Sequence, residues 1–374
     1  MRIGFFGDGY LNLEEKGRDG SVVDRRGFMS ELNKLGHETF YLVRGRTSTE
    51  FNCIDVFDEI KNVDMSFERY KPEWDLVLKF PKLDILIVES RNRIFGAYGG
   101  VFLQYKILKH YMNTDTRICM WDFDMNNYPI TCDRSIYTGK PYGVNDPHFL
   151  ETLHAKRHEF IYLFPYEVTS ELKTKFNYSK NLHTFLWAIN EDFYSKLELP
   201  NVKDFDLVYG GSDYNRRKKF EAFYGTPANN GFKVGMTGVW NKKKGSKEFV
   251  SQFKLEYFGY LSIIDTFKNI NRGLATIQIL MDHYVKIGYV TQRQIEGPFS
   301  NVITFIDKDI KNSDKYFMKE FCISSDEVDN TLRELQSMTI DEYMGIAKMQ
   351  QKWLLDNGFA WKNRVKEFLT IIGA

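Results

Sequence analysis

The chain has 374 residues, which exceeds the usual size of one domain and favours two domains of ordinary size. Hydrophobic residues make up 43% and aromatic residues 16%, a globular composition that argues against a largely disordered protein. The 51 Lys and Arg against 50 Asp and Glu leave a net charge of +1, which argues against a protein that coats nucleic acid over its whole surface; local basic patches are compatible with it.

The cysteine and histidine patterns predict no metal site and no disulfide framework. The 4 cysteines are widely spaced without a CxxC pair. His154 and His158 share a predicted helix face, but the HExxH pattern is absent. No apolar run approaches the roughly 20 residues of a membrane span, and a core strand rather than a secretory signal opens the chain. We therefore expect a soluble, cytoplasmic, monomeric protein that binds no membrane.

The first half of the chain alternates strands and helices. Ile3–Phe6 is a predicted strand, Ser21–Leu35 a helix that Gly36 ends, and Thr39–Val43 the next strand, which together make a βαβ unit. Further strands are expected at Leu76–Leu78, Ile85–Val88, Arg117–Trp121, Phe160–Phe164 and Thr184–Ala188, with a helix at Gly100–Met112. Such alternation indicates a mostly parallel sheet covered on both faces, as in a Rossmann-like domain.

The same alternation restarts after the linker Pro200–Lys203. Strands are expected at Leu207–Tyr209, Phe232–Met236, Leu255–Phe258, Thr276–Leu280 and Val302–Ile306. The tail Ser324–Ile372 has the apolar spacing of helices. The predicted fold class is α/β, with two Rossmann-like domains facing across a cleft and a helical C-terminal tail. We expect domains at 1–200 and 201–340, and helices at 341–374 that can pack back on the first domain.

The stretch Asp204–Lys219 has the pattern of an anion site. An apolar strand leads into the turn Gly210-Gly211, Ser212 or Asp213 is a candidate N-cap, and basic residues open a helix. Backbone N–H groups of such a turn, the helix dipole and nearby guanidinium groups favour a phosphate or diphosphate. An ordinary turn between a strand and a solvated basic helix has the same pattern.

Three further groups of residues are candidates for chemistry or binding. Arg293 and Glu296 share a helix face and could meet phosphate and vicinal hydroxyls, or form a surface ion pair worth at most ~1 kcal/mol. Asp122 directly follows a buried strand, where a carboxylate can act as a general base; Asp124 could instead hold the acceptor, and either could form an Asx-turn. Asp24 follows a glycine-rich loop, Gly7–Gly20, that could close over an acceptor or be a flexible connection without chemistry.

A lysine cluster at the expected cleft domain could contact a nucleic-acid backbone, although lysine runs are usually solvated loops. Its members are Lys242, Lys243, Lys244 and Lys247.

The second half of the chain resembles the DNA β-glucosyltransferases of T-even bacteriophages. Asp206–Ser212 is similar to the D-V-I-Y-G-G-S strand and turn of that family, Arg293–Glu296 to its R-x-x-E helix start, and Val302–Asp307 to its apolar strand ending in Ile-Asp, in the same order. Weaker similarity covers most of the first half, including Met1-Arg2-Ile3 and Glu31–Gly36. The family implies a GT-B fold and an inverting transfer of a sugar from a UDP-sugar onto 5-hydroxymethylcytosine in duplex DNA.

The resemblance also implies roles for individual residues. Asp122 matches the catalytic base of the family, and Asp24 an acidic residue near sugar and acceptor. The expected donor ligands are Gly211 and Ser212 at the diphosphate, Arg293 at phosphate, Glu296 at the ribose, and Gly259, Tyr260 and Leu261 at uracil. Tyr214 and Lys218 stand where the family has phosphate arginines, so Arg216, Arg217 and Lys218 are the substitutes.

The function predicted from the sequence is therefore transfer of glucose, or of a pentose such as arabinose, to hydroxymethylated phage DNA, with the target base turned out of the stack. A divalent metal is compatible with this chemistry but is not indicated. Two alternatives remain: a glycosyltransferase for a glycan or small molecule, and a nucleic-acid-binding protein without catalysis.

Overall fold

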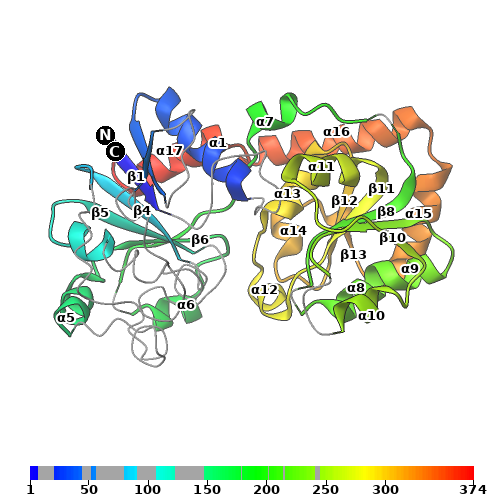
Figure 1. Cartoon of the computed structure of the whole chain (residues 1–374), viewed down its shortest axis with the longest axis horizontal. Helices are drawn as coiled ribbons and strands as arrows, with labels where there is room; N and C mark the ends of the chain where they lie inside the picture. The colour runs from blue at the N-terminus through cyan, green and yellow to red at the C-terminus, as the bar shows by residue number, and fades with distance from the viewer. Residues whose placement is uncertain are drawn as a thin grey trace, which may run out of the picture. The chain divides into compact units, whose positions relative to one another are not determined.

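The computed structural model describes residues 1–6, 21–43, 52–55, 80–90, 107–122, 147–177, 179–200, 202–213, 215–240 and 245–374. The chain divides into two compact units. Unit 1 comprises Met1–Leu11, Met29–Phe185 and Glu367–Ala374, and unit 2 comprises Asn12–Phe28 and Leu186–Lys366. Each unit is built on its own parallel sheet (Figure 1).

Unit 1 contains a sheet of seven strands in the order β3-β2-β1-β4-β5-β6-β7, and every pair is parallel. The strands are β1 (Arg2–Phe6), β2 (Glu38–Val43), β3 (Cys53–Asp55), β4 (Ile85–Ser90), β5 (Arg117–Asp122), β6 (Ile161–Phe164) and β7 (Leu182–Thr184). Helix α1 (Ser21–Lys34) connects β1 with β2, and the left-handed Gly36 (φ +81°) follows it, as predicted. The described part of this unit also contains α5 (Pro147–Lys156) and α6 (Ser170–Lys175).

The last strand of unit 1 lies earlier in the chain than predicted. The strand is Leu182–Thr184, and the apolar run that follows it is outside the sheet. Phe185 is buried because its ring packs against Trp121 of β5 and Phe368, and its N–H donates the last bond to β6, at the Phe164 carbonyl (2.7 Å). The expected strand Leu76–Leu78 lies outside the described residues, as does most of the expected helix Gly100–Met112, of which residues 107–111 are helical.

Unit 2 contains a parallel sheet of six strands in the order β10-β9-β8-β11-β12-β13. The strands are β8 (Phe205–Gly210), β9 (Val234–Thr237), β10 (Leu255–Tyr257), β11 (Gly273–Gln278), β12 (Ile303–Asp307) and β13 (Cys322–Ile323). The first five confirm the predicted strands, whereas β13 and β3 were not predicted because runs of two or three residues carry no periodicity.

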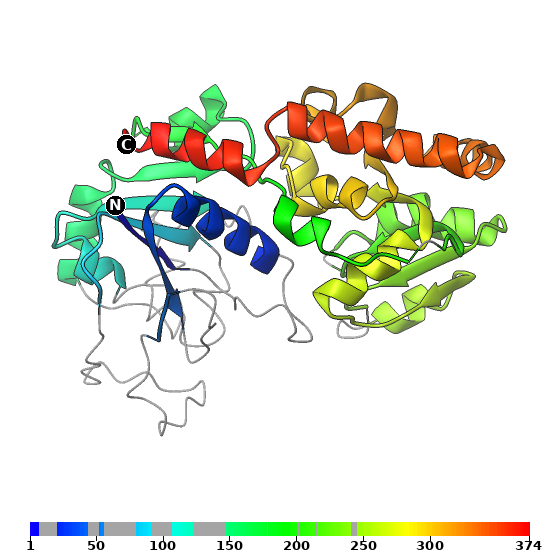
Figure 2. The ribbon, with the colours of Figure 1, turned by 90° about the horizontal axis from the view of Figure 1, so that it is seen from above.

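Helices cover both faces of the second sheet. Those around it are α7 (Glu191–Ser195), α8 (Arg217–Phe220), α9 (Thr226–Asn229), α10 (Ser246–Val250), α11 (Ile263–Asn271), α12 (Asp282–Ile287), α13 (Gln292–Phe299), α14 (Ser313–Tyr316), α15 (Val328–Ser337) and α16 (Ile340–Asp356), with α17 (Trp361–Ile371) ending the chain. Alternate β8 residues face opposite ways: Leu207 and Tyr209 join one core cluster, and Val208 joins another with Ile270 of α11. Figure 2 shows α16 lying against α13.

A π-helical segment, η2 (Glu221–Gly225), joins α8 to α9 without a break. Pro227, two residues past the end of this segment, has no N–H to donate to the Phe223 carbonyl four residues before it. The N–H of Thr226 reaches the carbonyl of Glu221, five residues back, which is the π pattern. The resulting helix, 217–229, begins at the carboxyl edge of β8 with the basic cluster and buries Phe223 and Tyr224 below it.

In both sheets the strand order reverses direction beside the first strand of the unit, between β1 and β4 and between β8 and β11. Ligands of open α/β sheets bind at the carboxyl ends of the strands at such a reversal. A ligand site in unit 2 is therefore expected at the loops that follow β8 and β11.

Candidate active site

The loops after β8, β9 and β10 are hydrogen-bonded to one another. The N–H of Gly211 donates to the Thr237 carbonyl (3.0 Å), and the N–H of Val239 donates to Ser212 Oγ (3.0 Å). The N–H of Gly238 donates to the Gly259 carbonyl (2.8 Å). Gly238 has φ +129°, and a Cβ there would lie 1.9 Å from the Gly211 carbonyl oxygen, so only glycine fits this approach. These bonds fix the turn, the Gly211 N–H is already engaged, and the space that a Cβ of Gly211 would take is filled by the Tyr209 hydroxyl.

The predicted N-cap at Ser212 or Asp213 is wrong. Helix α8 begins after Arg216, and no side chain caps it. Ser212 Oγ is occupied by the β9 loop, and Asp213 binds Arg217 instead. The left-handed Asn215 (φ 59°) turns the chain into the helix, a conformation that asparagine tolerates better than most residues.

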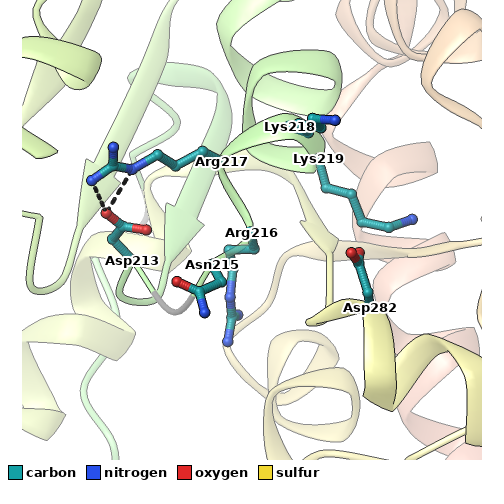
Figure 3. A pocket seen from close by; sticks show the side chains of 7 residues that line it. All are labelled: Asp213, Asn215, Arg216, Arg217, Lys218, Lys219 and Asp282. Carbon is teal, nitrogen blue, oxygen red and sulfur yellow. Dashed lines mark hydrogen bonds and ion pairs between the residues drawn. The ribbon is translucent and has the colours of Figure 1, made fainter. Parts of the chain in front are cut away.

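An open pocket of ≈ 480 Å³ lies at this edge of the sheet (Figure 3). It is lined by Asp213, Asn215, Arg216, Arg217, Lys218, Lys219 and Asp282. Four of these side chains are basic and two are acidic, so the lining favours an anion. The sequence signal included all four basic residues and named Arg216, Arg217 and Lys218 as phosphate ligands, but it did not indicate Asp282.

The two arginines of the pocket have different surroundings. Arg217 makes two contacts with Asp213 Oδ2, from Nε (2.8 Å) and Nη2 (2.7 Å), and its guanidinium lies 5.5 Å from the Phe249 ring centre (Figure 3). Arg216 Nη1 donates to the Tyr209 hydroxyl and to the Ile279 carbonyl, each at 3.2 Å. Arg217 is thus held by a buried carboxylate, whereas Arg216 bridges neutral oxygens of β8 and of the segment after β11.

Lys219 connects the pocket to the end of β12. Its Nζ donates to Asp307 and lies 3.4 Å from Asp309 Oδ2. Burial raises the pKa of the Asp307 carboxyl, and the bond from Lys219 opposes that rise. Asp307 also accepts the N–H of Asp309 (3.0 Å), which fixes its orientation.

Arg293 and Glu296 form an ion pair on α13 with Nη1 and Oε2 3.2 Å apart. The Glu296 side chain is only 2% exposed, so this is not the solvated surface pair of the alternative interpretation. The guanidinium of Arg293 also lies 5.3 Å from the Phe267 ring centre of α11. A capping box between Thr291 and Gln294 sets the start of the helix that carries both residues.

Asp122 is the last residue of β5 in unit 1 and is buried. Its Oδ2 accepts a hydrogen bond from the Tyr166 hydroxyl (2.9 Å), and Tyr166 follows the neighbouring strand β6. The bond from the phenol fixes the orientation of a carboxyl group at the carboxyl end of the sheet, where a general base can act. No pattern in the sequence pointed to Tyr166, because the partner lies on another strand.

Several predicted site residues lie outside the described residues: Asp124, Tyr214, Lys242, Lys243 and Lys244, together with the loop Gly7–Gly20 and the side chain of Asp24. Lys247 is exposed on α10, and Lys218 is exposed at the pocket. Gly259 is left-handed (φ +74°), Tyr260 is 49% exposed, and Leu261 is half-buried beside it.

Within the described ranges, no cluster of His, Cys, Asp and Glu has the arrangement of a metal site. Over the same part of the chain, no helix combines the length and apolar character of a membrane span.

Solved structures with this architecture include the DNA-modifying enzyme β-glucosyltransferase, which matches at TM-score 0.65 and 14% identity over 100% of both chains. T4 phage β-glucosyltransferase in complex with UDP and Mn²⁺ matches equally, at 15% identity. The chain has the GT-B fold. A GT-B glycosyltransferase of avilamycin A biosynthesis, AviGT4, matches at TM-score 0.57 and 10% identity over 100% of this chain and 98% of the other. By sequence, the chain matches no protein-family model and no curated protein.

The GT-B assignment confirms the predicted fold class of two Rossmann-like domains with a helical C-terminal region. At such low sequence identity the likeness establishes the fold, and function has to be argued from the site.

Proposed function

We propose that the protein is an inverting glycosyltransferase that transfers a sugar from a UDP-sugar to 5-hydroxymethylcytosine in DNA. The observation that carries the proposal is the basic pocket at the strand-order reversal of unit 2 in a GT-B fold. The full-length likeness to a DNA-modifying glucosyltransferase supports the choice of donor and acceptor.

The donor half of the proposal rests on charge. A diphosphate at the pocket would meet Arg216 and Lys218, with Ser212 and Gly211 at the adjacent turn. Arg293 on α13 would supply a second guanidinium, and Glu296 would accept hydrogen bonds from ribose hydroxyls. Tyr260 and its neighbours Gly259 and Leu261 would meet the uracil. The basic side chains can balance the diphosphate, so a metal is not part of the proposal.

The acceptor half rests on Asp122. Its carboxylate would take the proton of the hydroxymethyl group as that oxygen attacks the anomeric carbon of the donor. The bond from the anomeric carbon to the β-phosphate oxygen breaks in the same step, and UDP leaves with its negative charge stabilised by the arginines. Attack opposite to the leaving group inverts the anomeric centre. The place of Asp122 at the end of β5 and the Tyr166 bond that orients its carboxyl group suit a single general base.

The DNA contacts and the sugar are the finer parts of the proposal. Lys247 on α10, with Lys242, Lys243 and Lys244 before it, would hold the phosphate backbone while the target base is turned out. Glucose and a pentose such as arabinose are both compatible with these nucleotide contacts, because pocket shape around the sugar sets that choice.

A second candidate is transfer to a small-molecule acceptor. The likeness to AviGT4 favours it, since that GT-B protein is a glycosyltransferase of antibiotic biosynthesis. Both candidates share the donor site and differ in the acceptor.

The test is to incubate the protein with a panel of UDP-sugars and duplex DNA containing 5-hydroxymethylcytosine, with and without Mg²⁺ or Mn²⁺, and to weigh the digested nucleosides. We expect 5-hydroxymethyl-2′-deoxycytidine to gain the mass that one transferred sugar adds, and matched cytosine DNA to gain none. No mass gain with any donor would rule out the DNA acceptor, and binding of UDP in that case would favour the small-molecule candidate.

A further inference from the structure

The hydroxyl of Tyr224 occupies a place in the second sheet that backbone would otherwise fill. Strands β8 and β11 pair at Phe205 with Gly273 and at Leu207 with Ala275. Two residues further along β11, the N–H of Ile277 donates to the Tyr224 hydroxyl (2.7 Å), which donates in turn to the carbonyl of Ile277 (2.5 Å). Alternate residues of a strand direct their backbone groups to the same neighbour, so this hydroxyl stands in for β8.

The π-helical segment brings Tyr224 to this position. The side chain is fully buried, and its ring packs against Tyr209 of β8 (4.9 Å) and Phe220 (5.3 Å). Burial raises the pKa of the Tyr224 hydroxyl, so that it stays protonated and can donate and accept at once. The phenol therefore separates β8 from β11 while leaving both polar groups of Ile277 satisfied.

Arg216 likewise takes the place of a β8 backbone partner, two residues further along the chain. Ile279 is again two residues along, and its carbonyl accepts from Arg216 Nη1 (3.2 Å), which also reaches the Tyr209 hydroxyl (3.2 Å). On the side of β11 that faces β8, the backbone groups of Ile277 thus bond to the Tyr224 phenol, and the carbonyl of Ile279 bonds to the Arg216 guanidinium. The same Arg216 lines the pocket, at the ends of the two strands.

We propose that Tyr224 is a positioning residue for nucleotide-diphosphate binding: its hydroxyl holds β8 and β11 apart and so fixes where Arg216 presents its charge. This inference rests on the proposed donor site. Without the hydroxyl, the polar groups of Ile277 need another partner, and pairing with the backbone of β8 would close the space that Arg216 occupies.

The sheet offers a matched control in Tyr343 of α16. Its hydroxyl donates to the Leu274 carbonyl (2.8 Å) and accepts from the Ile303 N–H (3.3 Å), at the amino-terminal ends of β11 and β12. Tyr343→Phe therefore removes the same kind of buried bonds from the same sheet, at the edge away from the pocket.

The experiment measures thermal stability and the Kd of UDP by calorimetry for the wild type, Tyr224→Phe and Tyr343→Phe. Both variants should lose stability, because each leaves buried backbone groups without a partner. We expect the Kd of UDP to rise by about tenfold in Tyr224→Phe, the equivalent of one lost charge-assisted hydrogen bond, and to stay within about twofold in Tyr343→Phe.

A folded Tyr224→Phe variant with the Kd of the wild type would overturn the inference, as would an equal rise in both variants. If Tyr224→Phe does not fold, Tyr224→His replaces it, because an imidazole keeps a polar ring but is shorter than the phenol and does not reach Ile277; an unchanged Kd in that variant would also overturn the inference. A wild-type protein that binds no UDP would instead remove the proposed function. Hydrogen exchange at the Ile277 amide distinguishes a failure of the Tyr224 inference from a failure of the proposed function, because it reports on the bond to Tyr224 without any ligand.

Discussion

A half-buried lysine, Lys203, should make the stability of this protein depend on pH. Lys203 Nζ donates to the carbonyls of Asn271 (2.6 Å) and Asn301 (2.7 Å) and lies 5.0 Å from the Tyr343 ring centre. Burial lowers the pKa of Lys203 from 10.5 to about 7. A neutral amine still has two N–H groups, so both hydrogen bonds survive deprotonation.

The direction of the effect follows from proton uptake on unfolding. Because the folded pKa lies below the unfolded one, the unfolded chain binds more protons between about pH 7 and pH 10.5, and the free energy of unfolding rises with pH across that window. Integrating the two titrations gives a gain of about 2 kcal/mol between pH 7 and pH 9.

The assay is urea denaturation of the wild type and Lys203→Met at pH 7, 8 and 9. Methionine keeps the length of the side chain but neither titrates nor donates to the two carbonyls. We expect the stability advantage of the wild type to widen by about 2 kcal/mol from pH 7 to pH 9, while titrations common to both proteins cancel. An advantage that stays constant over this range would refute the reasoning.

Three further predictions concern the proposed reaction. Asp122→Asn should lower kcat of transfer by about 10²–10⁴-fold and leave the Kd of UDP unchanged, whereas an active Asp122→Asn with an inactive Asp124→Asn would move the base. Glu296→Ala should raise the KM for the UDP-sugar, and an unchanged KM would contradict the ribose contact. Arg216→Ala should raise the Kd of UDP, measured by calorimetry, by about tenfold or more. Arg217→Ala should chiefly lower Tm in thermal melts, because the buried Asp213 then loses its ion pair. If Arg217→Ala instead raises the Kd and Arg216→Ala chiefly lowers Tm, the phosphate contact belongs to Arg217.

The sequence predicted those parts of the fold that depend on local pattern. Apolar runs marked β8 and β11, and Gly36 marked the end of α1, because periodicity and left-handed glycine are local signals. The parts that depend on contacts between distant residues were not predictable. Nothing in the sequence distinguishes Arg216 from Arg217. Their contacts differ because Arg216 donates to the Tyr209 hydroxyl of β8, whereas Arg217 pairs with the buried Asp213.

The candidate site shows the same division. The spacing of Arg293 and Glu296 indicated a shared helix face, but their burial depends on how α13 packs against α11 and the sheet. The N-cap prediction failed for a related reason: Ser212 is a good capping residue, yet a loop from another strand takes its oxygen first. Local preference is overridden wherever a tertiary partner competes for the same atom.

The π turn at Glu221–Gly225 makes the helix that follows the glycine turn one residue longer than an α-helical relative would need. Each residue of an α-helix advances the side chain by about 100°, so an inserted residue moves every side chain before it to another face relative to those after it. If this helix is aligned with a continuous α-helix through its last turn, Thr226–Asn229, the basic residues of the two helices therefore fall on different faces. A deletion within Glu221–Gly225 combined with Pro227→Ala would turn the basic residues away from the pocket while leaving their number unchanged. In this protein the geometry of one helical turn, and not the count of arginines and lysines, decides which basic side chains line the pocket.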